Sequence, residues 1–442
     1  RTYEKQEMFS IEHKGHYHVL KAEEKERMEW ARGIEKVRKN LSVDLSDTSS
    51  RIAMGSKSRA EIKEALLKKG YPVEDNSKFR EVDETIGANL KGIELRDYQE
   101  EYVEKAYSEK AAVLANPAGS GKTVTSIGLM CKVDAPTLIL VPQRNLVNQW
   151  KRELLDKTTL TEDQIGEYHG DTKEMNDVTI ATYHMAGEKT NLFRQDWGLI
   201  IFDEVHHIPS DLFRKTATLQ STRRIGLSAS PVREDTKERE IFALIGREIG
   251  GDWARFFSEG HVVKPDVEIR MIDWASDFYR HKYEEASGIK KAIIASKNPA
   301  KKEILEDLLE EHEGKKTLIF CDWLDQGEDL SNDYDVPFIS GETDFEDREE
   351  YFEEFREGDL DTMIVSRIGD EGLDLPNAEV GIVMSGQGGS RRQATQRAGR
   401  VMRPVGDAQV YMVATKGSNE EDFVKQQVEL LKEKGVPVTV KE

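Results

Sequence analysis

Cysteine is scarce in this chain of 442 residues: the two cysteines, Cys131 and Cys321, lie far apart and neither belongs to a CxxC pair. This scarcity argues against a disulfide framework or a zinc site and suits the reducing cytosol. Uninterrupted apolar runs of 18 or more residues are also missing, so the sequence predicts no membrane-spanning helix. Nothing in the sequence resembles a targeting segment. We therefore expect a cytoplasmic protein without a membrane partner.

Basic residues are fewer than acidic ones: the chain has 64 Lys and Arg against 84 Asp and Glu, which gives a formal net charge of −20. Overall acidity repels phosphates, whereas a nucleic-acid binder usually presents a basic face. The local distribution matters more, since salt screens charges beyond about 10 Å. The acidic run 342–361 reads as a solvated helix face. Five arginines gather between positions 391 and 403: Arg391, Arg392, Arg397, Arg400 and Arg403.

The length suits about three domains of ~150 residues each. Residues 1–90 read as a small α/β accessory domain with no assigned chemistry. They contain a possible strand at 17–20, a helical pattern at 23–39, a Ser/Asp-rich loop at 41–50 and a second helix at about 58–69. Their histidine cluster has no cysteine or acidic helix partner, and it reads as part of a polar strand rather than a metal site.

From about residue 91 the pattern becomes an alternation of strands and helices, which is typical of parallel sheets with crossover helices. Apolar runs predict strands in a first unit, residues 91–260, and in a second unit, residues 261–418. The runs of the first unit are 111–115, 137–141, 178–181, 199–202 and 224–227. Those of the second are 317–321, 362–365, 380–384 and 410–413. Residues 259–265 form the expected linker, and 419–442 hold a charged amphipathic helix.

The loop 115–123, with the sequence ANPAGSGKT, lies between a predicted strand and a predicted helix. Glycines let backbone N–H groups close around phosphate oxygens, and the helix N-terminus adds its positive dipole end. Lys122 would reach the β- and γ-phosphates, and the Thr123 hydroxyl would bind Mg²⁺. Asn116 departs from the usual pattern, which has a glycine there. The alternative is an ordinary glycine-rich turn before Lys-Thr.

Two carboxylates, Asp203 and Glu204, follow the apolar run 199–202 directly. Asp203 can bind Mg²⁺ through its water shell, because Mg²⁺ prefers carboxylate and water oxygens. Glu204 is then placed to orient and deprotonate an attacking water. The alternative is a strand end that exposes two acids to solvent.

Arg400 and Arg403 are three positions apart, so in a helix they share one side. Two guanidiniums there could reach a γ-phosphate and stabilise transition-state charge as arginine fingers. For either residue taken alone, the default is a surface arginine on a helix.

The motifs ANPAGSGKT, DEVH, SAS (228–230), SRIGDEGLDLP and QRAGRVMR occur in the order found in superfamily 2 helicases. More narrowly, LSASPVRED, DEVHHIP and QRAGRVMRP resemble the XPB group, the translocase subunit of TFIIH and its archaeal relatives. The resemblance covers about residues 93–415. It implies an α/β fold of two tandem RecA-like parallel-sheet domains behind the small N-terminal domain.

The resemblance also implies a set of ATP contacts. Gln99 would hydrogen-bond the adenine edge and Arg96 would stack on the base, while Asp374 would touch the ribose. Gln396 would sense the γ-phosphate beside the arginine fingers. The other residues implied at the nucleotide are Pro117, Ala118, Gly119, Ser120, Gly121, Lys122, Thr123 and Gly372. ATP and Mg²⁺ are the expected cofactors.

DNA is the expected partner, held without sequence preference through phosphate contacts. The residues implied by resemblance are Gln143, Arg144, Thr182, Ser340, Gly341, Ser366 and Arg367, with Arg233, Glu234 and Asp235 as the XPB-type element. Ser228, Ala229 and Ser230 would couple hydrolysis to these contacts. Residues 275–298 resemble either a reduced thumb or the helix that enters the second unit.

The resemblance implies ATP-driven 3′→5′ translocation on duplex or forked DNA in repair or transcription, at the nucleoid if the source is prokaryotic. An RNA helicase or RNA-stimulated ATPase remains an alternative. A second alternative is a nucleotide-switched scaffold that docks proteins through its N-terminal domain or its C-terminal helix.

Overall fold

The computed structural model describes most of the chain. The described residues are 9–54, 56–69, 71, 73–76, 82–117, 119–170, 172–188, 192, 196–205, 212, 216, 219, 221–228, 241, 245–366, 375–385, 394, 397–399, 401 and 408–441. Contacts divide the chain into two units. The first comprises Arg1–Ala115 and Lys122–Gly250, and the second comprises Asn116–Gly121 and Gly251–Glu442.

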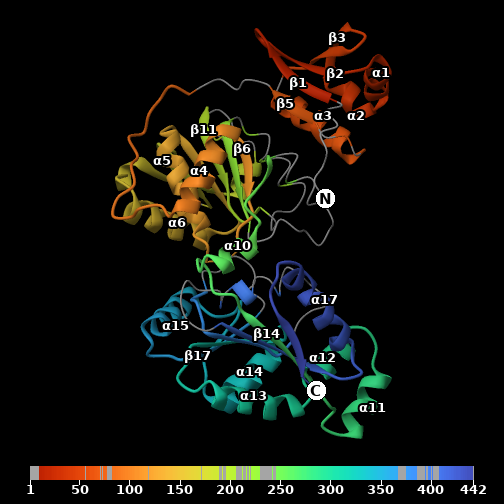
Figure 1. The fold of residues 1–442 in the computed structure, drawn as a ribbon, viewed down its shortest axis with the longest axis vertical. Helices are drawn as coiled ribbons and strands as arrows, with labels where there is room; N and C mark the ends of the chain where they lie inside the picture. Colours follow the sequence, from red (N-terminus) through yellow and green to blue (C-terminus); the bar gives the residue numbers. More distant parts are fainter. Residues whose placement is uncertain are drawn as a thin grey trace. The chain divides into compact units, whose positions relative to one another are not determined.

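The N-terminal part forms a five-stranded sheet with the strand order β3-β4-β2-β1-β5 (Figure 1). Its strands are β1 (Phe9–Lys14), β2 (Tyr17–Ala22), β3 (Leu41–Ser46), β4 (Ser49–Ile52) and β5 (Val73–Asn76). Its helices are α1 (Lys25–Gly33), α2 (Glu35–Lys39) and α3 (Ser56–Lys68). Buried apolar side chains such as Ile11, Leu20 and Met28 form its own core.

Two predictions for this part are wrong. The single helix over 23–39 is two helices, because Ile34 adopts an extended backbone between α1 and α2. The loop predicted over 41–50 is the antiparallel pair β3–β4. Its Ser and Asp residues alternate with Leu and Val, which is a strand pattern, but β3 is exposed at nearly every position, so no buried face marks it as a strand in the sequence.

The first parallel sheet has eight strands in the order β13-β6-β12-β11-β7-β10-β8-β9, and only β9 runs antiparallel to its neighbour. The strands are β6 (Ala111–Leu114), β7 (Thr137–Val141), β8 (Ile165–His169), β9 (Thr172–Lys173), β10 (Val178–Thr182), β11 (Trp197–Phe202), β12 (Ser221–Leu227) and β13 (Arg247–Ile249). All five strands predicted for this unit are present. β8, β9 and β13 were not predicted.

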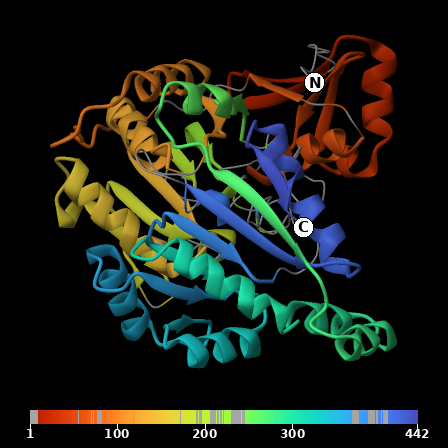
Figure 2. The same ribbon diagram turned by 60° about the horizontal axis from the view of Figure 1, so that its bottom comes forward.

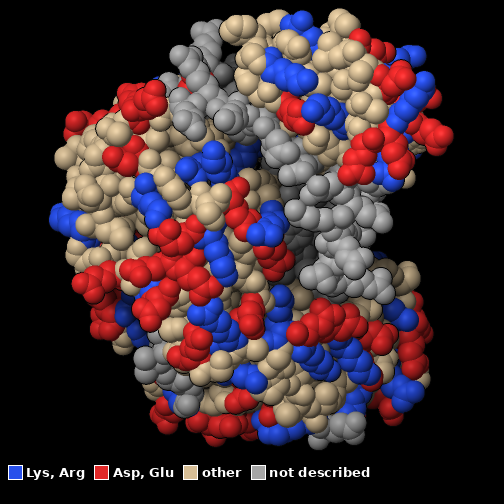
Figure 3. Space-filling view, turned by 45° about the horizontal axis from the view of Figure 1, so that its top comes forward, with Lys and Arg blue, Asp and Glu red and all other residues tan. Residues whose placement is uncertain are grey.

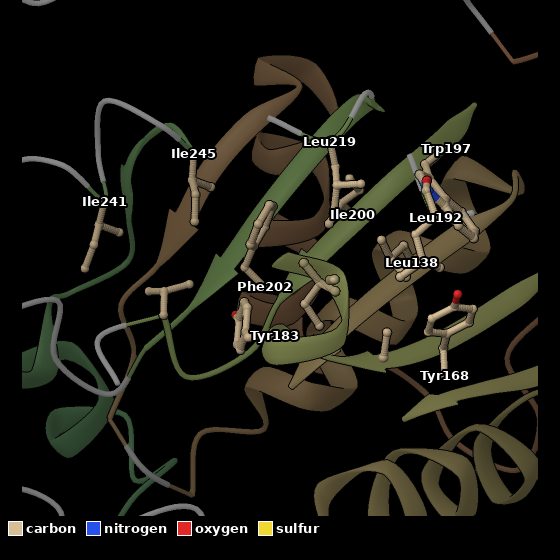
Figure 4. Close-up of a cluster of buried hydrophobic side chains, with 14 of the residues drawn as sticks. Leu138, Tyr168, Tyr183, Leu192, Trp197, Ile200, Phe202, Leu219, Ile241 and Ile245 are labelled. Carbon is tan, nitrogen blue, oxygen red and sulfur yellow. The ribbon is translucent and has the colours of Figure 1, made fainter. Parts of the chain in front are cut away.

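The helices of this unit are α4 (Asp97–Glu109), which precedes β6, and α5 (Lys122–Val133), α6 (Arg144–Lys157) and α7 (Tyr183–Gly187), which follow β6, β7 and β10. Figure 1 labels the first three, and a short 3₁₀ helix lies at Glu162–Gln164. A buried cluster packs on one face of the sheet (Figure 4). It includes Leu138, Ile200 and Phe202, each essentially inaccessible to solvent. This core fixes β7 and β11, the strands that lead into Gln143 and Asp203.

The second sheet has seven strands in the order β16-β17-β15-β18-β19-β14-β20, all paired in parallel (Figure 2). The strands are β14 (Asp266–Ile272), β15 (Thr317–Phe320), β16 (Phe338–Ile339), β17 (Thr362–Val365), β18 (Val380–Val383), β19 (Gln409–Thr415) and β20 (Val438–Lys441). The helices are α10 (Trp253–Ser258), α11 (Asp277–Glu285), α12 (Ile289–Ser296), α13 (Ala300–Glu311), α14 (Leu324–Tyr334), α15 (Phe345–Glu357) and α17 (Asn419–Glu433).

The C-terminal helix α17 is confirmed as amphipathic, and its apolar side packs on β19 and α12 of its own unit. At its start, the buried Glu420 forms an ion pair with the buried Lys301, at 2.8 Å. The ammonium of Lys301 also donates to the carbonyls of Met384 and Val413, so the charge is fully hydrogen-bonded. The helix therefore keeps its charged side, with Lys425 and Glu429, toward solvent.

Gly246 lies at a point of close approach between β13 and β6. A Cβ atom there would come within 2.2 Å of the carbonyl carbon of Ala111. Gly246→Ala should therefore lower the free energy of unfolding by about 1–3 kcal/mol, as expected for overpacking. Thermal unfolding measures the loss. Gly381→Ala is the control, because its nearest contact is an ordinary 3.5 Å; equal effects from both variants would contradict this account.

Candidate active site

Five neighbouring strands of the first sheet bring most of the predicted first-unit residues to one edge. β6, β12, β11, β7 and β10 are parallel and adjacent in that order, so their carboxyl ends meet at the same edge. The residues that follow these ends include Lys122, Ser228, Asp203, Gln143 and, at the end of β10, Thr182. Ligands of open parallel sheets bind at such carboxyl edges.

The loop between β6 and α5 has the backbone of a phosphate cradle. Gly119 and Gly121 have φ angles of 75° and 73°, in the left-handed region that side chains with a Cβ avoid. The Ser120 N–H donates to the Pro117 carbonyl at 3.3 Å, which tightens the turn. Helix α5 then starts at Lys122 and runs for 12 residues, and the N–H groups in the first turn of a helix have no carbonyl acceptor within the helix.

Asn116, at the position of the missing glycine, is fully buried. Its Oδ1 accepts a hydrogen bond from the Gly251 N–H at 3.4 Å. A glycine could not make this contact. The departure from the usual motif therefore supplies a side-chain amide that binds the segment just after Gly250, where the contacts of the chain divide.

Asp203 and Glu204 form a tightly packed acidic pair at the end of β11. Oδ1 of Asp203 accepts the Glu204 N–H at 2.9 Å, and Oδ2 accepts the indole N–H of Trp150 at 2.8 Å. Desolvation and the neighbouring Glu204 carboxylate raise the pKa of Asp203 to about 7, against the opposing hydrogen bond of Trp150 and charge of Lys122. A cation beside Asp203 would restore its charged form.

Glu204 has a φ of 46°, an uncommon conformation for a residue other than glycine. Such backbone strain clusters at functional sites, where the surrounding structure holds it in place. Here the hydrogen bond from its own N–H to Asp203 and the burial of Val205 fix the turn.

Hard oxygen donors are the ligands that Mg²⁺ prefers, and it usually takes only one or two from the protein, the rest being water and phosphate. Asp203 and the Thr123 hydroxyl, two oxygen donors at the same sheet edge, fit this requirement. Among the described residues no cluster of three or more His, Cys, Asp or Glu could hold a metal ion.

Ser228 lies between the two halves of this site. It follows β12, which pairs with β6 on one side and β11 on the other. Its N–H donates to the Leu114 carbonyl at 3.1 Å, and the residue is fully buried. A coupling role for Ser228 stays a prediction, and this position between the loop strand and the Asp203 strand supports it.

The predicted strand-contact residues of the first unit stand at helix starts. Gln143 is the residue before α6, and Arg144 is the first residue of that helix. Thr182 caps α7, since its hydroxyl accepts the Met185 N–H. The start of the 14-residue helix α6 is a position at which backbone N–H groups favour anions, which agrees with the phosphate contacts predicted there. Strand binding by these residues stays a prediction.

Arg96 and Gln99 are hydrogen-bonded to one another at the start of α4. The Gln99 side-chain oxygen accepts the Arg96 N–H at 2.9 Å, and Gln99 is buried. The Arg96 guanidinium donates to the Tyr98 hydroxyl at 3.3 Å. This geometry makes Gln99 a helix cap, and the predicted contacts with adenine stay predictions.

In the second unit, Ser340 and Ser366 follow the neighbouring strands β16 and β17. Ser340 is buried, and its hydroxyl accepts the Glu342 N–H at 3.2 Å, which leaves Gly341 exposed at the tip of this turn. Ser366 is also buried and donates its N–H to the Ile339 carbonyl at 2.9 Å. The structure thus brings these predicted strand contacts together at one edge of the second sheet.

Comparisons with known proteins place the chain in a family. Residues 257–436 match the family described as ERCC3/RAD25/XPB C-terminal helicase, and residues 92–233 match that of the type III restriction enzyme res subunit. The DNA 3'-5' helicase XPB of Kineococcus radiotolerans is 39% identical over 85% of this chain and 70% of its own length. The chain belongs to the XPB helicase family.

Two further likenesses support the XPB assignment and the fold. Rad25 of Haloarcula marismortui is 48% identical over 90% of this chain. The Hef helicase domain of Pyrococcus furiosus superposes with a TM-score of 0.53 at 16% identity, over 76% of this chain and 98% of that domain. The predicted family and the two-sheet helicase fold are confirmed. The chain spans 64% and 66% of the length of two Rad25 relatives.

Several residues that the XPB resemblance singled out lie outside the described part of the chain. They are Ala118, Ala229, Ser230, Arg233, Glu234, Asp235, Arg367, Gly372, Asp374, Gln396, Arg400 and Arg403. Their roles stay predictions. No helix in the described ranges is long and apolar enough to cross a membrane.

Sequence reasoning missed the buried ion pair of this XPB chain. Arg397, counted above among the clustered arginines, is 2% exposed and pairs with Asp322, which follows β15. The guanidinium also donates to the Ser385 carbonyl at 3.1 Å, and the Ser385 hydroxyl accepts the Asp322 N–H at 2.9 Å. Arg397 therefore adds nothing to a basic surface. Only its position beside Gln396 could have pointed to a special role.

Proposed function

We propose that this chain hydrolyses ATP to translocate on duplex or forked DNA in the 3′→5′ direction. One observation carries the proposal: the carboxyl edge of the first sheet holds the Lys122 loop, Ser228 and the Asp203–Glu204 pair beside two strand-contact helix starts. In this proposal, nucleotide chemistry and strand contact share one edge of the first sheet. Membership of the XPB family supports DNA as the strand.

Each residue of the edge has a proposed task. Lys122 and the N–H groups at the start of α5 hold the phosphates. Thr123 and Asp203 would hold Mg²⁺, which when bound neutralises phosphate charge. Glu204 accepts the proton of the attacking water. Gln396, Arg400 and Arg403 keep the roles that the resemblance gives them.

The DNA partner is compatible with the acidic composition of the chain. On the face shown in Figure 3, acidic and basic side chains are intermingled. Contacts made through helix starts and backbone N–H groups need no large basic patch, because the donors carry partial positive charge. We therefore expect binding that weakens with salt, with a slope set by the few phosphates contacted.

The test is the ATPase rate without nucleic acid, with single-stranded DNA, with duplex DNA and with RNA, each at two salt concentrations. We expect the rate to be higher with DNA than without nucleic acid, and higher with DNA than with RNA. Lys122→Ala should abolish the rate in every condition, which excludes a contaminating ATPase. Equal stimulation by RNA and DNA would favour the RNA alternative. A rate indifferent to all nucleic acids would favour the scaffold.

A further inference from the structure

Trp150 links helix α6 to the acidic pair. Its indole N–H donates to Oδ2 of Asp203 at 2.8 Å, and the residue is 2% exposed. Arg144, a predicted strand contact, begins the same helix, and Trp150 lies six residues further on. At about 1.5 Å per residue, the two are roughly 9 Å apart along one rigid element.

Tyr183 links helix α7 to the same residue. Its hydroxyl donates to the backbone carbonyl of Asp203 at 2.7 Å. Tyr183 follows Thr182, the second predicted strand contact, and it is 2% exposed. Figure 4 shows the ring beside Phe202, the last residue before Asp203. Asp203 is thus held at its side chain by one strand-contact element and at its backbone by the other.

Buried Trp and Tyr side chains ordinarily need a hydrogen-bond partner, so a packing role must be weighed against a functional one. Trp197 illustrates the ordinary case in the same core: it is 1% exposed, and its indole donates to the Leu192 carbonyl at 3.0 Å. It begins β11 (Figure 4), whereas Asp203 comes directly after Phe202, the last residue of that strand. Trp150 differs because its acceptor is the proposed metal ligand.

We propose that Trp150 and Tyr183 are positioning residues through which strand engagement at α6 and α7 sets the orientation of Asp203. A strand that draws the start of α6 toward its phosphates moves the indole with the helix. The carboxylate must then follow the indole or lose its hydrogen bond. The side-chain carboxylate and the backbone of Asp203 are thereby positioned together, through contacts that all lie within the first unit. This inference rests on the proposed function, since it needs both a strand and a nucleotide.

The coupling must be reciprocal, because DNA and nucleotide change one another's affinity by the same factor. We would measure the Kd of a non-hydrolysable ATP analogue with Mg²⁺, with and without saturating single-stranded DNA. The Kd of a labelled oligonucleotide would be measured with and without the analogue. The variants are Trp150→Phe, Tyr183→Phe and their combination, and Trp197→Phe is the matched control. Thermal unfolding is followed for each.

We expect the wild type to show the same coupling factor, about 5–150-fold, from both directions. Trp150→Phe should reduce that factor several-fold from both directions while its Kd for DNA alone stays within about twofold. The combined variant should bring the factor close to one, and Trp197→Phe should match the wild type. The Mg²⁺ concentration for half-saturation of the analogue should rise for Trp150→Phe.

Two outcomes would overturn the inference. Trp150→Phe could match Trp197→Phe in coupling, or it could lower the unfolding temperature with coupling intact, which is the signature of packing alone. Failure of the proposed function looks different, because the wild type itself would then show neither coupling nor DNA-stimulated hydrolysis.

Discussion

Glu204→Gln should lower the rate of ATP hydrolysis by about 10²–10⁴-fold, the range for loss of a general base. Gln has the shape of Glu but cannot accept the proton of the attacking water. The bond from the residue-204 N–H to Asp203 involves only the backbone of residue 204, so the turn should persist. ATP binding should therefore survive, and the enzyme should hold ATP unhydrolysed. Single-turnover hydrolysis and equilibrium ATP binding separate the two effects.

Glu162→Gln is the matched control for this prediction, because Glu162 is exposed in a short 3₁₀ helix of the same unit. It should leave both hydrolysis and binding unchanged. If Glu204→Gln kept a rate within a few-fold of the wild type, Glu204 would not be the base. If it lost ATP binding as well, the variant would have disturbed the site rather than removed a proton acceptor.

Asp322→Ala should destabilise the second unit by about 3–5 kcal/mol, because it leaves the buried guanidinium of Arg397 without its carboxylate. For a unit of this size each kcal/mol shifts the unfolding temperature by about 2–4 °C, so we expect a fall of roughly 6–20 °C. Hydrogen exchange of the β15 and β18 amides assigns the loss to this unit. The β6 and β7 amides should keep their protection.

The double variant Asp322→Leu with Arg397→Met tests whether the unpaired charge causes this loss. Replacing both members of a buried pair by apolar residues is often neutral or stabilising, whereas removing one is costly. The double variant should therefore be more stable than Asp322→Ala. If it were equally unstable, the loss would come from packing or from the Ser385 hydrogen bonds instead. The rate of ATP hydrolysis by the double variant would show whether the Asp322–Arg397 pair also supports the QRAGRVMR motif, to which Arg397 belongs.

The fold of the first unit was predictable because its central strands stand out in the sequence as short, continuous apolar runs. β7 is buried at all five positions and β11 at all six, so each is a continuous apolar run. Parallel strands covered on both faces have this pattern. The positions of Asp203 and Ser228 at one edge then follow from the parallel direction of their strands.

Strands at the edges of the sheets escaped prediction for the opposite reason. β3 and β20 are largely exposed, so no buried face imposes an apolar pattern on them. The local sequence of residues 275–298 likewise fits both a reduced thumb and the helix that enters the second unit. Residues 277–296 form two helices, α11 and α12, and expose Phe278 and Ile289, which either interpretation would allow.

The residues that organise the site were harder to predict because their partners are distant in sequence. Trp150 and Asp203 are 53 positions apart, and Asp322 and Arg397 are 75 apart. Within α6, Trp150 is one more apolar residue on the buried side. Arg397 reads as one more positive charge. Only the folded chain shows which carboxylate each of them meets.

Displacement of a third DNA strand from a triplex is the most direct test of the central claim, that hydrolysis at this sheet edge moves the protein along DNA. We expect the wild type to displace the strand only with ATP and Mg²⁺, and Lys122→Ala and Glu204→Gln to leave it bound. DNA-stimulated ATP hydrolysis without any displacement by the wild type would contradict translocation.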